Sequence, residues 1–481
     1  MTATVATPPG GSGTKLALAE KVGYGLGDTA SNFVWALMMN FIMYFYTDIF
    51  GITAAATGTM LLVARATDGL FDFFVGAVAD RTRTRWGKFR PYLLWLCVPL
   101  AVVFVMAFTT PAAAAPVKLA YAWLTYNLLM LLYSAINIPY GALSGVMTDD
   151  PLDRTSLNAW RMGLAQVGGI VANTSFLGLV ARLGGGDDAV GARRTVTLFA
   201  AAAVCLFLVT FFTTRERIQP PATQKVGLRR DLHMLLANPH WLMMFVVGIV
   251  NITFAVIRGS AGIYYLKSYQ GWAADEAPVA TFFPLDRILP LNRIAAFFLV
   301  GGLAMIAGAM LTRPVVQRIG KKWAFVGSLL VVAATAVPFF FIRPGQTGLV
   351  FLFHVLGMLA AGVNATLYWT LLADTADFAE WKFGARSTGL VFSATTCAQK
   401  AGMGIGAAVA GMILDWCGYV PNEVQSVAAL RGILAMMSLI PAVGLAGLAL
   451  AFCGYGLSEH ACRTIREELA VRRANASGPV G

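Results

Sequence analysis

Three ionisable residues lie within one apolar segment, whose sequence is ARATDGLFDFF. Arg65, Asp68 and Asp72 are spaced by three and four residues, so a helix places all three on one face. Two carboxylates one turn apart repel each other, which strengthens proton binding at one of them or creates an oxygen site for a monovalent cation. The alternative is that Arg65 neutralises Asp68 and the cluster only braces the packing of helices.

A further charged residue lies in a second apolar segment, SATTCAQKAGMGIG. Lys400 follows Thr395 and Thr396 there, and a buried lysine needs an anion or must lose its proton. Its candidate partners are Asp68, Asp72 or a carboxylate on a bound molecule. The GMGIG stretch is not a phosphate-binding loop, because no strand precedes it and no GK[ST] ends it. Its small residues favour close approach of helices instead.

Polar side chains also recur in apolar segments elsewhere in the chain. Tyr133, Ser134 and Asn137 lie in LLYSAINIPYGALSG, while Asn32 and Arg161 lie in two other segments. Hydroxyl groups, amides and an aromatic ring can bind and stack on a sugar, and they can equally cross-link helices. Their convergence from several helices predicts a polar central cavity.

Opposite charges cluster at the ends of apolar segments. Asp374, Asp377 and Arg386 lie in LLADTADFAEWKFGARS, and Arg154 and Arg318 occupy two other such ends. We expect these charges to form ion pairs that close one side of the molecule. The alternative is solvated loop charges, worth less than about 1 kcal/mol per pair.

Composition determines which elements must hold these residues. The chain has 481 residues, of which 58% are hydrophobic and 12% are charged, against about 25% charged in soluble proteins. This excludes a soluble globule and predicts an all-α membrane protein. Because about 20 apolar residues span the hydrocarbon, we predict twelve transmembrane helices, at 24–48, 53–79, 91–110, 117–147, 160–181, 195–213, 240–266, 294–312, 323–342, 347–373, 387–414 and 427–453.

A basic loop occurs twice, once in each set of six predicted helices. Residues 80–90 read DRTRTRWGKFR, and residues 317–323 read QRIGKKW. Twelve spans alone suit several classes of membrane protein, but twelve spans with this repeat predict the major facilitator fold. Most of the 36 Lys and Arg residues fall in the even-numbered loops and the termini, which predicts that both termini are cytoplasmic. The predicted units are a disordered N-terminus at 1–20, six-helix halves at 21–213 and 239–456, a linker at 214–238 and a tail at 457–481.

Several of these segments together resemble a known family, the glycoside–pentoside–hexuronide:cation symporters, which include melibiose permease. They are YGLGDTASNF, FYTDIFGI, LLVARATDGLFD, ADRTRTRWGKFRPYLLW, NIPYGAL and ADTADFAEWK, and the resemblance extends from about Lys21 to Ser458. It implies a cation-coupled sugar symporter that works by alternating access. It further implies that Arg154, Arg318, Asp374, Asp377 and Arg386 form a cytoplasmic gate.

The resemblance also implies where the coupling cation binds. Asp68 and Asp72 match the family's cation-binding carboxylates, and Ser134 matches a further ligand position. Phe71 stands where the family has an Asn. The loss of one oxygen ligand slightly favours a proton over sodium, with sodium and lithium left open.

The sugar pocket departs from the family pattern as well. Tyr133, Arg161 and Lys400 match pocket positions, while Asn32 and Asn137 replace two carboxylates, and Gly141 replaces a Trp. With fewer carboxylates the pocket repels an anionic ligand less, which favours a uronide as substrate. Neutral pentosides and other glycosides stay open as substrates. Asn binds hydroxyl groups, and carboxylates of the chain can form ion pairs with Arg161 and Lys400.

No enzyme, cofactor or metal chemistry is predicted. The four His and six Cys residues show no ligand spacing, and the first 14 residues lack the pattern of a cleaved signal peptide. We therefore expect a bacterial inner-membrane protein that acts as a monomer among membrane lipids and does not bind nucleic acid. The alternative is an exporter or a lipid carrier with the same fold.

Overall fold

The computed structural model describes residues 16–148, 150–217, 235–273, 276, 292–383, 388–457 and 459–476. Within these ranges the backbone is almost entirely helical. The described residues contain no strand and only one isolated antiparallel bridge, between Thr84 and Gly87. Most of the predicted disordered N-terminus and most of the predicted linker lie outside the described residues.

The first group of helices contains α1 to α7, and its members pack against one another. They are α1 Leu18–Asn40, α2 Ile42–Tyr44, η1 Phe45–Ile49, α3 Ala54–Arg81, α4 Arg90–Ala107, α5 Ala115–Met147, α6 Pro151–Gly184 and α7 Asp188–Thr213.

The second group contains α9 to α15, and α16 follows it. They are α9 Pro239–Tyr264, η2 Tyr265–Tyr269, α10 Arg293–Ile319, α11 Lys321–Ala336, η4 Val337–Phe340, α12 Thr347–Phe383, α13 Thr388–Trp416, α14 Val427–Met437, α15 Leu439–Phe452 and α16 Glu459–Ala476. Each of the twelve predicted segments coincides with one of these helices or with a run of consecutive ones.

Ten helical segments of the described chain are long and apolar enough to cross a membrane. The segments beginning with α1 and α3 are not among these ten. Both contain charged side chains, including Asp28 in α1 and Arg65 and Asp68 in α3, which lower their mean hydropathy. The α3 segment contains three of the ionisable residues to which the sequence assigned chemistry, Arg65, Asp68 and Asp72.

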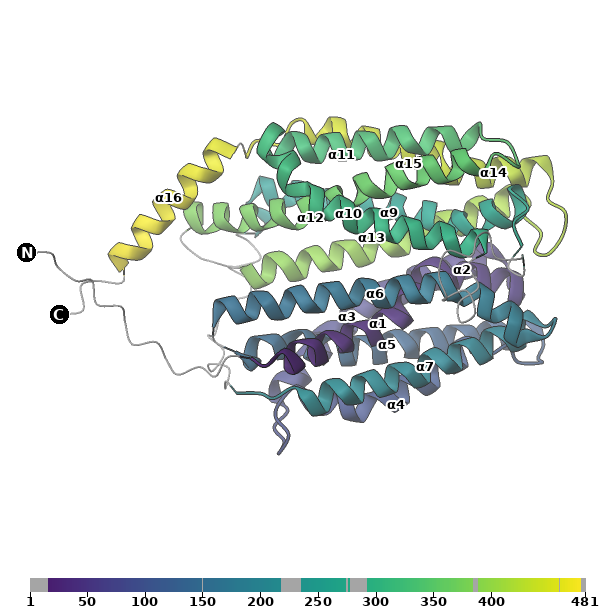
Figure 1. Ribbon diagram of the computed structural model, residues 1–481, viewed down its shortest axis with the longest axis horizontal. Coiled ribbons are helices and arrows are strands. Elements are labelled where there is room, and N and C mark those ends of the chain that lie inside the picture. The colour runs from purple at the N-terminus through teal and green to yellow at the C-terminus, as the bar shows by residue number, and fades with distance from the viewer. Residues whose placement is uncertain are drawn as a thin grey trace, which may run out of the picture.

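The two groups lie side by side, purple to teal below and green to yellow above (Figure 1). Across the boundary, α3 packs against α13, α6 against α10, and α1 against α9. At one end, which we call the terminal end, the backbone N–H of Leu16 donates to Asp153 at the start of α6, and α16 extends from the same end (Figure 1). The opposite end is called the far end.

The GMGIG stretch of α13 permits close packing against α9 within the second group. A Cβ added at Gly402 would lie 2.5 Å from the Ile249 carbonyl oxygen of α9, and one at Gly406 would lie 2.7 Å from the Thr253 carbonyl oxygen. A side chain at either position would force α9 and α13 apart. The prediction that these small residues serve close helix packing is confirmed.

The two basic loops end in the same local structure. Gly87 and Gly320 both adopt positive φ, at 114° and 79°, which side chains with a Cβ rarely adopt. Glu216 then accepts hydrogen bonds from the backbone N–H groups of Lys88, Phe89 and Arg90 at 2.7 to 2.9 Å. Likewise, Glu459 accepts the Lys321 N–H at 2.8 Å. Each loop thus uses a glycine turn and an acidic acceptor to begin the next helix.

Candidate functional site

Four charged side chains form a cluster where α3 meets α13. Lys400 of α13 contacts both carboxylates of α3, with Nζ 3.0 Å from Asp68 Oδ2 and an ion pair to Asp72. Arg65 Nη1 lies 3.7 Å from Asp68 Oδ2. The Ser134 hydroxyl of α5 donates to Asp68 Oδ1 at 2.8 Å. The structure therefore brings together the predicted cation residues and Lys400, which the sequence separates by more than 300 positions.

The cluster is balanced in charge, since Arg65 and Lys400 oppose Asp68 and Asp72. Asp68 is fully buried, whereas the Asp72 side chain is 29% exposed. Among the described residues, Asp72 Oδ1 is buried without a hydrogen-bond donor, and Asp68 Oδ2 has ion-pair contacts but no hydrogen bond. These two oxygens have spare acceptor capacity, which a proton or a cation can occupy.

Arg161 is also paired with a carboxylate of the chain. Its Nε lies 2.8 Å from Asp28 Oδ2 of α1, and its guanidinium lies 5.2 Å from the centre of the Tyr140 ring. The Tyr140 hydroxyl donates to the Tyr24 carbonyl at 2.6 Å, which fixes the ring. Both cations that the sequence offered to a uronide, Arg161 and Lys400, thus face carboxylates of the protein in this conformation.

Aromatic stacking connects the cluster to the interior of the bundle. The rings of Trp35 and Tyr133 stack with centroids 5.6 Å apart, and the Arg65 guanidinium lies 5.2 Å from the Trp35 ring centre. Trp35 lines the central cavity. The cluster therefore adjoins the cavity through one aromatic side chain.

The remaining predicted sugar residues differ in their surroundings. Asn32 donates to the Asp28 carbonyl at 2.8 Å and Asn137 to the Tyr133 carbonyl at 3.0 Å. The Thr395 hydroxyl is buried and donates to the Val391 carbonyl at 2.8 Å, whereas Thr396 is exposed. Of the predicted sugar residues, only Asn32 lines the cavity.

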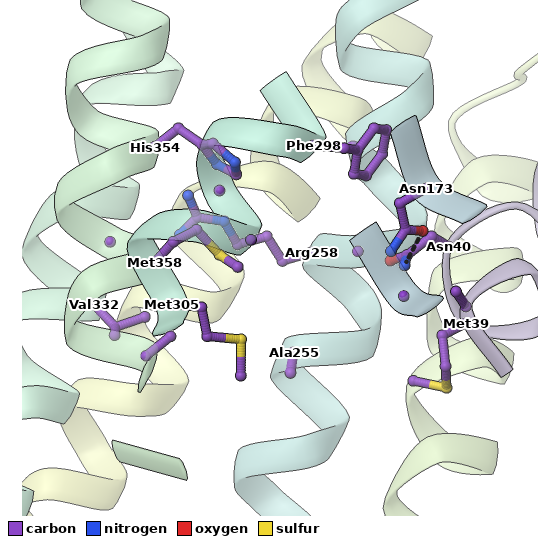
Figure 2. A pocket seen from close by; sticks show the side chains of 18 of the residues that line it. Met39, Asn40, Asn173, Ala255, Arg258, Phe298, Met305, Val332, His354 and Met358 are labelled. Carbon is purple, nitrogen blue, oxygen red and sulfur yellow. Dashed lines mark hydrogen bonds between the residues drawn. The ribbon is translucent and has the colours of Figure 1, made fainter. Parts of the chain in front are cut away.

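A central cavity of about 490 Å³ lies between the two groups of helices. Asn40 and Asn173 of the first group face it opposite Arg258 and His354 of the second group (Figure 2). Its aromatic lining includes Trp35, in addition to Phe254, Phe297 and Phe298. The volume lies in the range of small-molecule sites, and amides beside aromatic rings suit a polar ligand that has apolar faces.

Amide pairs line both sides of the cavity. Asn40 Nδ2 donates to Asn173 Oδ1 at 2.9 Å, which joins α1 to α6. Asn251 Nδ2 donates to Asn364 Oδ1 at 2.7 Å, which joins α9 to α12. Each pair leaves further donor and acceptor positions, so each side can bind hydroxyl groups of a ligand.

Sequence reasoning missed two cavity residues, Arg258 and His354. Both lie in apolar helices, and an ionisable group at such a position is itself a signal of function. Arg258 had no charged neighbour in its own segment, and His354 had no partner at metal-ligand spacing. Only the packing of α9 against α12 reveals that they share one wall of the cavity.

At the far end the two groups are joined by direct hydrogen bonds. The Thr47 and Tyr264 hydroxyls lie 2.7 Å apart, and Tyr419 donates to Asp48 Oδ1 at 2.6 Å. Lys267 donates to the Tyr44 hydroxyl. These contacts centre on η1 and η2, two π-helical turns that end the first long helix of each group. The structure is closed across this end of the boundary.

At the terminal end the predicted gate residues make contacts within their own group. Arg154 donates to the Thr148 carbonyl at 2.9 Å, and Lys321 pairs with Asp374 at 2.6 Å. Arg318 is exposed, and among the described residues no ion pair joins Arg154 or Arg318 to Asp374 or Asp377. Arg386 lies outside the described residues. The gate assignment stays a prediction.

The chain matches the family model described as MFS/sugar transport protein over residues 23–289 and 290–459. The chain belongs to this family. It is 36% identical over 459 residues to the inner membrane symporter YicJ of Escherichia coli, with 95% of each chain covered. It is 32% identical to the glucuronide carrier protein homolog of Escherichia coli, with 87% of this chain and 88% of that protein covered. These matches confirm the resemblance to glycoside–pentoside–hexuronide:cation symporters.

Solved structures confirm the fold. The crystal structure of a D-xylose–proton symporter superimposes with a TM-score of 0.66 at 13% identity, covering 91% of this chain and 97% of that one. Together with the apolar helices, the family establishes a multi-pass membrane protein with the major facilitator fold. As a member of this family, the protein is a sugar transporter and not an enzyme.

Proposed function

We propose that the protein is a cation-coupled symporter that imports a glycoside, pentoside or hexuronide across the bacterial inner membrane by alternating access. The observation that carries the proposal is the charge cluster beside the cavity. Asp68 and Asp72 form ion pairs with Lys400 across the boundary between α3 and α13, while Trp35 and Tyr133 connect the cluster to the cavity. A change in charge at this boundary therefore alters both the packing of the groups and the surroundings of the ligand.

The coupling ion binds at Asp68 and Asp72, with Ser134 as the polar neighbour. Ser134 donates to Asp68 Oδ1, so a proton suits this cluster slightly better than sodium, which needs several free oxygens around it. Binding of the cation weakens the attraction of Lys400 for Asp72 and lets the two helices rearrange. Coupling then requires that the cation and the sugar favour the same conformation.

The sugar binds between the groups. Asn32 and the stacked pair Trp35 and Tyr133 contribute on the side of α1 and α5, together with Asn137 and Arg161. Thr395, Thr396 and Lys400 approach from α13 once Lys400 separates from the carboxylates. Amides and hydroxyl groups bind the sugar hydroxyls, and aromatic rings stack on its apolar face.

The closed far end supports an inward-facing conformation with the terminal end in the cytoplasm. The basic loops, the first and last described residues and the described residues of the predicted gate lie at that end, in keeping with the excess of positive charge in cytoplasmic loops. In the outward-facing conformation, Arg154 of the first group pairs with Asp374 and Asp377 of the second group and closes the cytoplasmic exit, with Arg318 and Arg386 as the other charges of this gate. The same fold also serves exporters, so the direction of transport is part of the test.

The test is uptake by proteoliposomes that contain the purified protein. Radiolabelled neutral and acidic glycosides are supplied with an imposed proton gradient, sodium gradient or neither. We expect accumulation above equilibrium only with one of the two gradients directed inward. Absence of gradient-driven uptake across the panel, or uptake that ignores both gradients, contradicts the proposal. Outward transport against the imposed gradient favours the exporter.

A further inference from the structure

Arg258 is the single charged side chain among the described residues that line the cavity. The lining residues include no Asp or Glu, and the structure shows no ion pair or hydrogen bond of the Arg258 guanidinium within the described chain. An arginine stays charged under all physiological conditions, and burial of a charge without a counter-charge is costly. The cavity wall formed by α9 therefore has a net positive charge that the protein leaves uncompensated.

The surroundings hold the guanidinium in place without using its donors. It lies 5.0 Å from the centre of the buried Phe339 ring, and Figure 2 shows it extending beside His354 and Met358. Contact with an aromatic ring occupies a face of the guanidinium and leaves the N–H groups in its plane free. Arginine presents these N–H groups as a fork that matches the two oxygens of a carboxylate.

His354 next to it is oriented by its own contacts. Its ring stacks on Phe297 with centroids 3.5 Å apart, and Nε2 lies 3.1 Å from the Phe297 carbonyl oxygen. Because a carbonyl only accepts, Nε2 carries the hydrogen, and in a neutral imidazole Nδ1 is then an acceptor. The imidazole provides no counter-charge for Arg258 and leaves an acceptor for a sugar hydroxyl.

The geometry points to Arg258 as an anion-binding subsite that recognises the carboxylate or sulfonate of an acidic sugar or glycoside. The amide pairs Asn40–Asn173 and Asn251–Asn364 then serve the hydroxyl groups. This inference rests on the proposed function and deepens it, because it names the substrate class and the residue that selects it. It also transfers the role of anion partner from Arg161 and Lys400, which are paired with carboxylates of the chain, to Arg258 on the cavity wall.

The test compares two ligands that differ only at C6, where one has a carboxylate and the other a neutral hydroxymethyl group. Binding of 4-nitrophenyl β-D-glucuronide and 4-nitrophenyl β-D-glucoside to the full-length detergent-purified protein is measured by calorimetry, with a 6-sulfonate sugar as the second acidic probe. We expect wild type to bind an acidic probe at least about tenfold more tightly than the neutral one. Arg258→Gln should weaken that acidic probe about 10- to 100-fold and change the neutral one less than about threefold. If the glucuronide shows this loss, the recognised group is a carboxylate; if the 6-sulfonate sugar shows it, the recognised group is a sulfonate.

Two further variants complete the design. Arg343→Gln removes an exposed arginine of the same group and should leave both affinities unchanged. Arg258→Lys keeps the charge but loses the fork, so we expect an intermediate loss confined to the acidic probe. If Arg258→Gln does not purify in a folded form, the Arg258→Lys variant alone tests whether Arg258 binds the anionic group.

Equal affinity of wild type for acidic and neutral probes overturns the inference, as does a loss in Arg258→Gln that is the same for both. Inorganic sulfate that binds as tightly as the acidic sugars also overturns it. Because calorimetry needs no gradient, these outcomes are separate from the failure of the proposed function, which appears as absent uptake in proteoliposomes whatever the probes bind.

Discussion

Two places where charge lies inside the bundle, the cluster between α3 and α13 and the central cavity, differ in their balance. At the meeting of α3 and α13, two cations face two carboxylates, and Lys400 contacts both Asp68 and Asp72. In the cavity, Arg258 faces amides, aromatic rings and His354, and the described lining contains no carboxylate. The charges of the cluster are balanced without a ligand, whereas the positive charge in the cavity is not.

This difference in charge balance determines which ligands the cluster and the cavity can bind. A balanced cluster gains little from an anion, but its carboxylates can exchange Lys400 for a proton or a metal cation, so it suits a coupling site. A lone guanidinium in a cavity gains most from an oxyanion. Two ligands of opposite charge can then occupy one protein together, which is what symport of an acidic sugar with a cation requires.

The largest effect should follow from breaking the balance at the cluster. Asp72→Asn removes one of the two carboxylates with spare acceptor capacity and leaves Lys400 with less negative charge around it. We expect gradient-driven accumulation of the sugar to fall at least about 100-fold, because the coupling ion loses its ligand and the remaining charges are costly to bury. Initial rates and plateau levels in proteoliposomes measure this.

The matched control for this variant is Asp188→Asn. Asp188 is an exposed carboxylate in the first turn of α7, and its replacement should leave accumulation within about twofold of wild type. Normal accumulation by Asp72→Asn would remove that residue from the coupling site, and the same experiment on Asp68→Asn tests its partner.

A second prediction separates stability from transport at the same cluster. Lys400→Met alone leaves two carboxylates facing Arg65, and breaking a buried ion pair costs roughly 3–5 kcal/mol. Its thermal unfolding midpoint in detergent should fall by several degrees. The double variant Lys400→Met with Asp72→Asn should recover much of that loss while uptake stays absent. Strictly additive effects in this cycle would show that the pair does not interact in solution.

The fold could be predicted because apolar segment length is a strong physical constraint. The predicted helix ends were less accurate: α6 begins at Pro151 instead of 160, and α12 extends to Phe383 instead of 373. Counting apolar residues stops at charges such as Asp153 and Asp374. The backbone nevertheless stays helical past them, because its hydrogen bonds are made within the helix and do not require apolar side chains.

The site could be predicted only in part. Asp68, Asp72 and Lys400 stood out as charges in apolar segments, and Ser134 came from the family resemblance. The partners of the charged side chains could not be predicted from the sequence. The Arg161–Asp28 contact and the position of Arg258 on the cavity wall depend on how separate helices pack. A lone intramembrane arginine signals function, but its partner can be named only in three dimensions.

A third prediction concerns the aromatic contact between the two places. Trp35 stacks on Tyr133 and lines the cavity, and an aromatic ring contributes to binding without regard to charge. Trp35→Leu should therefore weaken the acidic and the neutral glycoside by the same factor, about 5- to 20-fold for a loss of roughly 1–2 kcal/mol. Equal calorimetric losses support this role. A loss confined to the acidic probe would place Trp35 in the recognition of charge instead.

The smallest effect should appear at the far end, whose hydrogen bonds hold the two walls of the cavity in their present relation. Tyr264→Phe removes the contact with Thr47 across the boundary, worth about 0.5–1.5 kcal/mol. The ratio of outward-facing to inward-facing molecules should therefore rise about two- to tenfold. Spin labels at Val117 and Val424, which are exposed and lie next to the far-end loops of the two groups, report that ratio as a distance distribution.

The control for this variant is Tyr269→Phe. It loses a hydrogen bond to the Ile342 carbonyl within the second group and should leave the distance distribution unchanged. Equal responses of the two variants would mean that closure of the far end does not depend on the hydrogen bond between the groups.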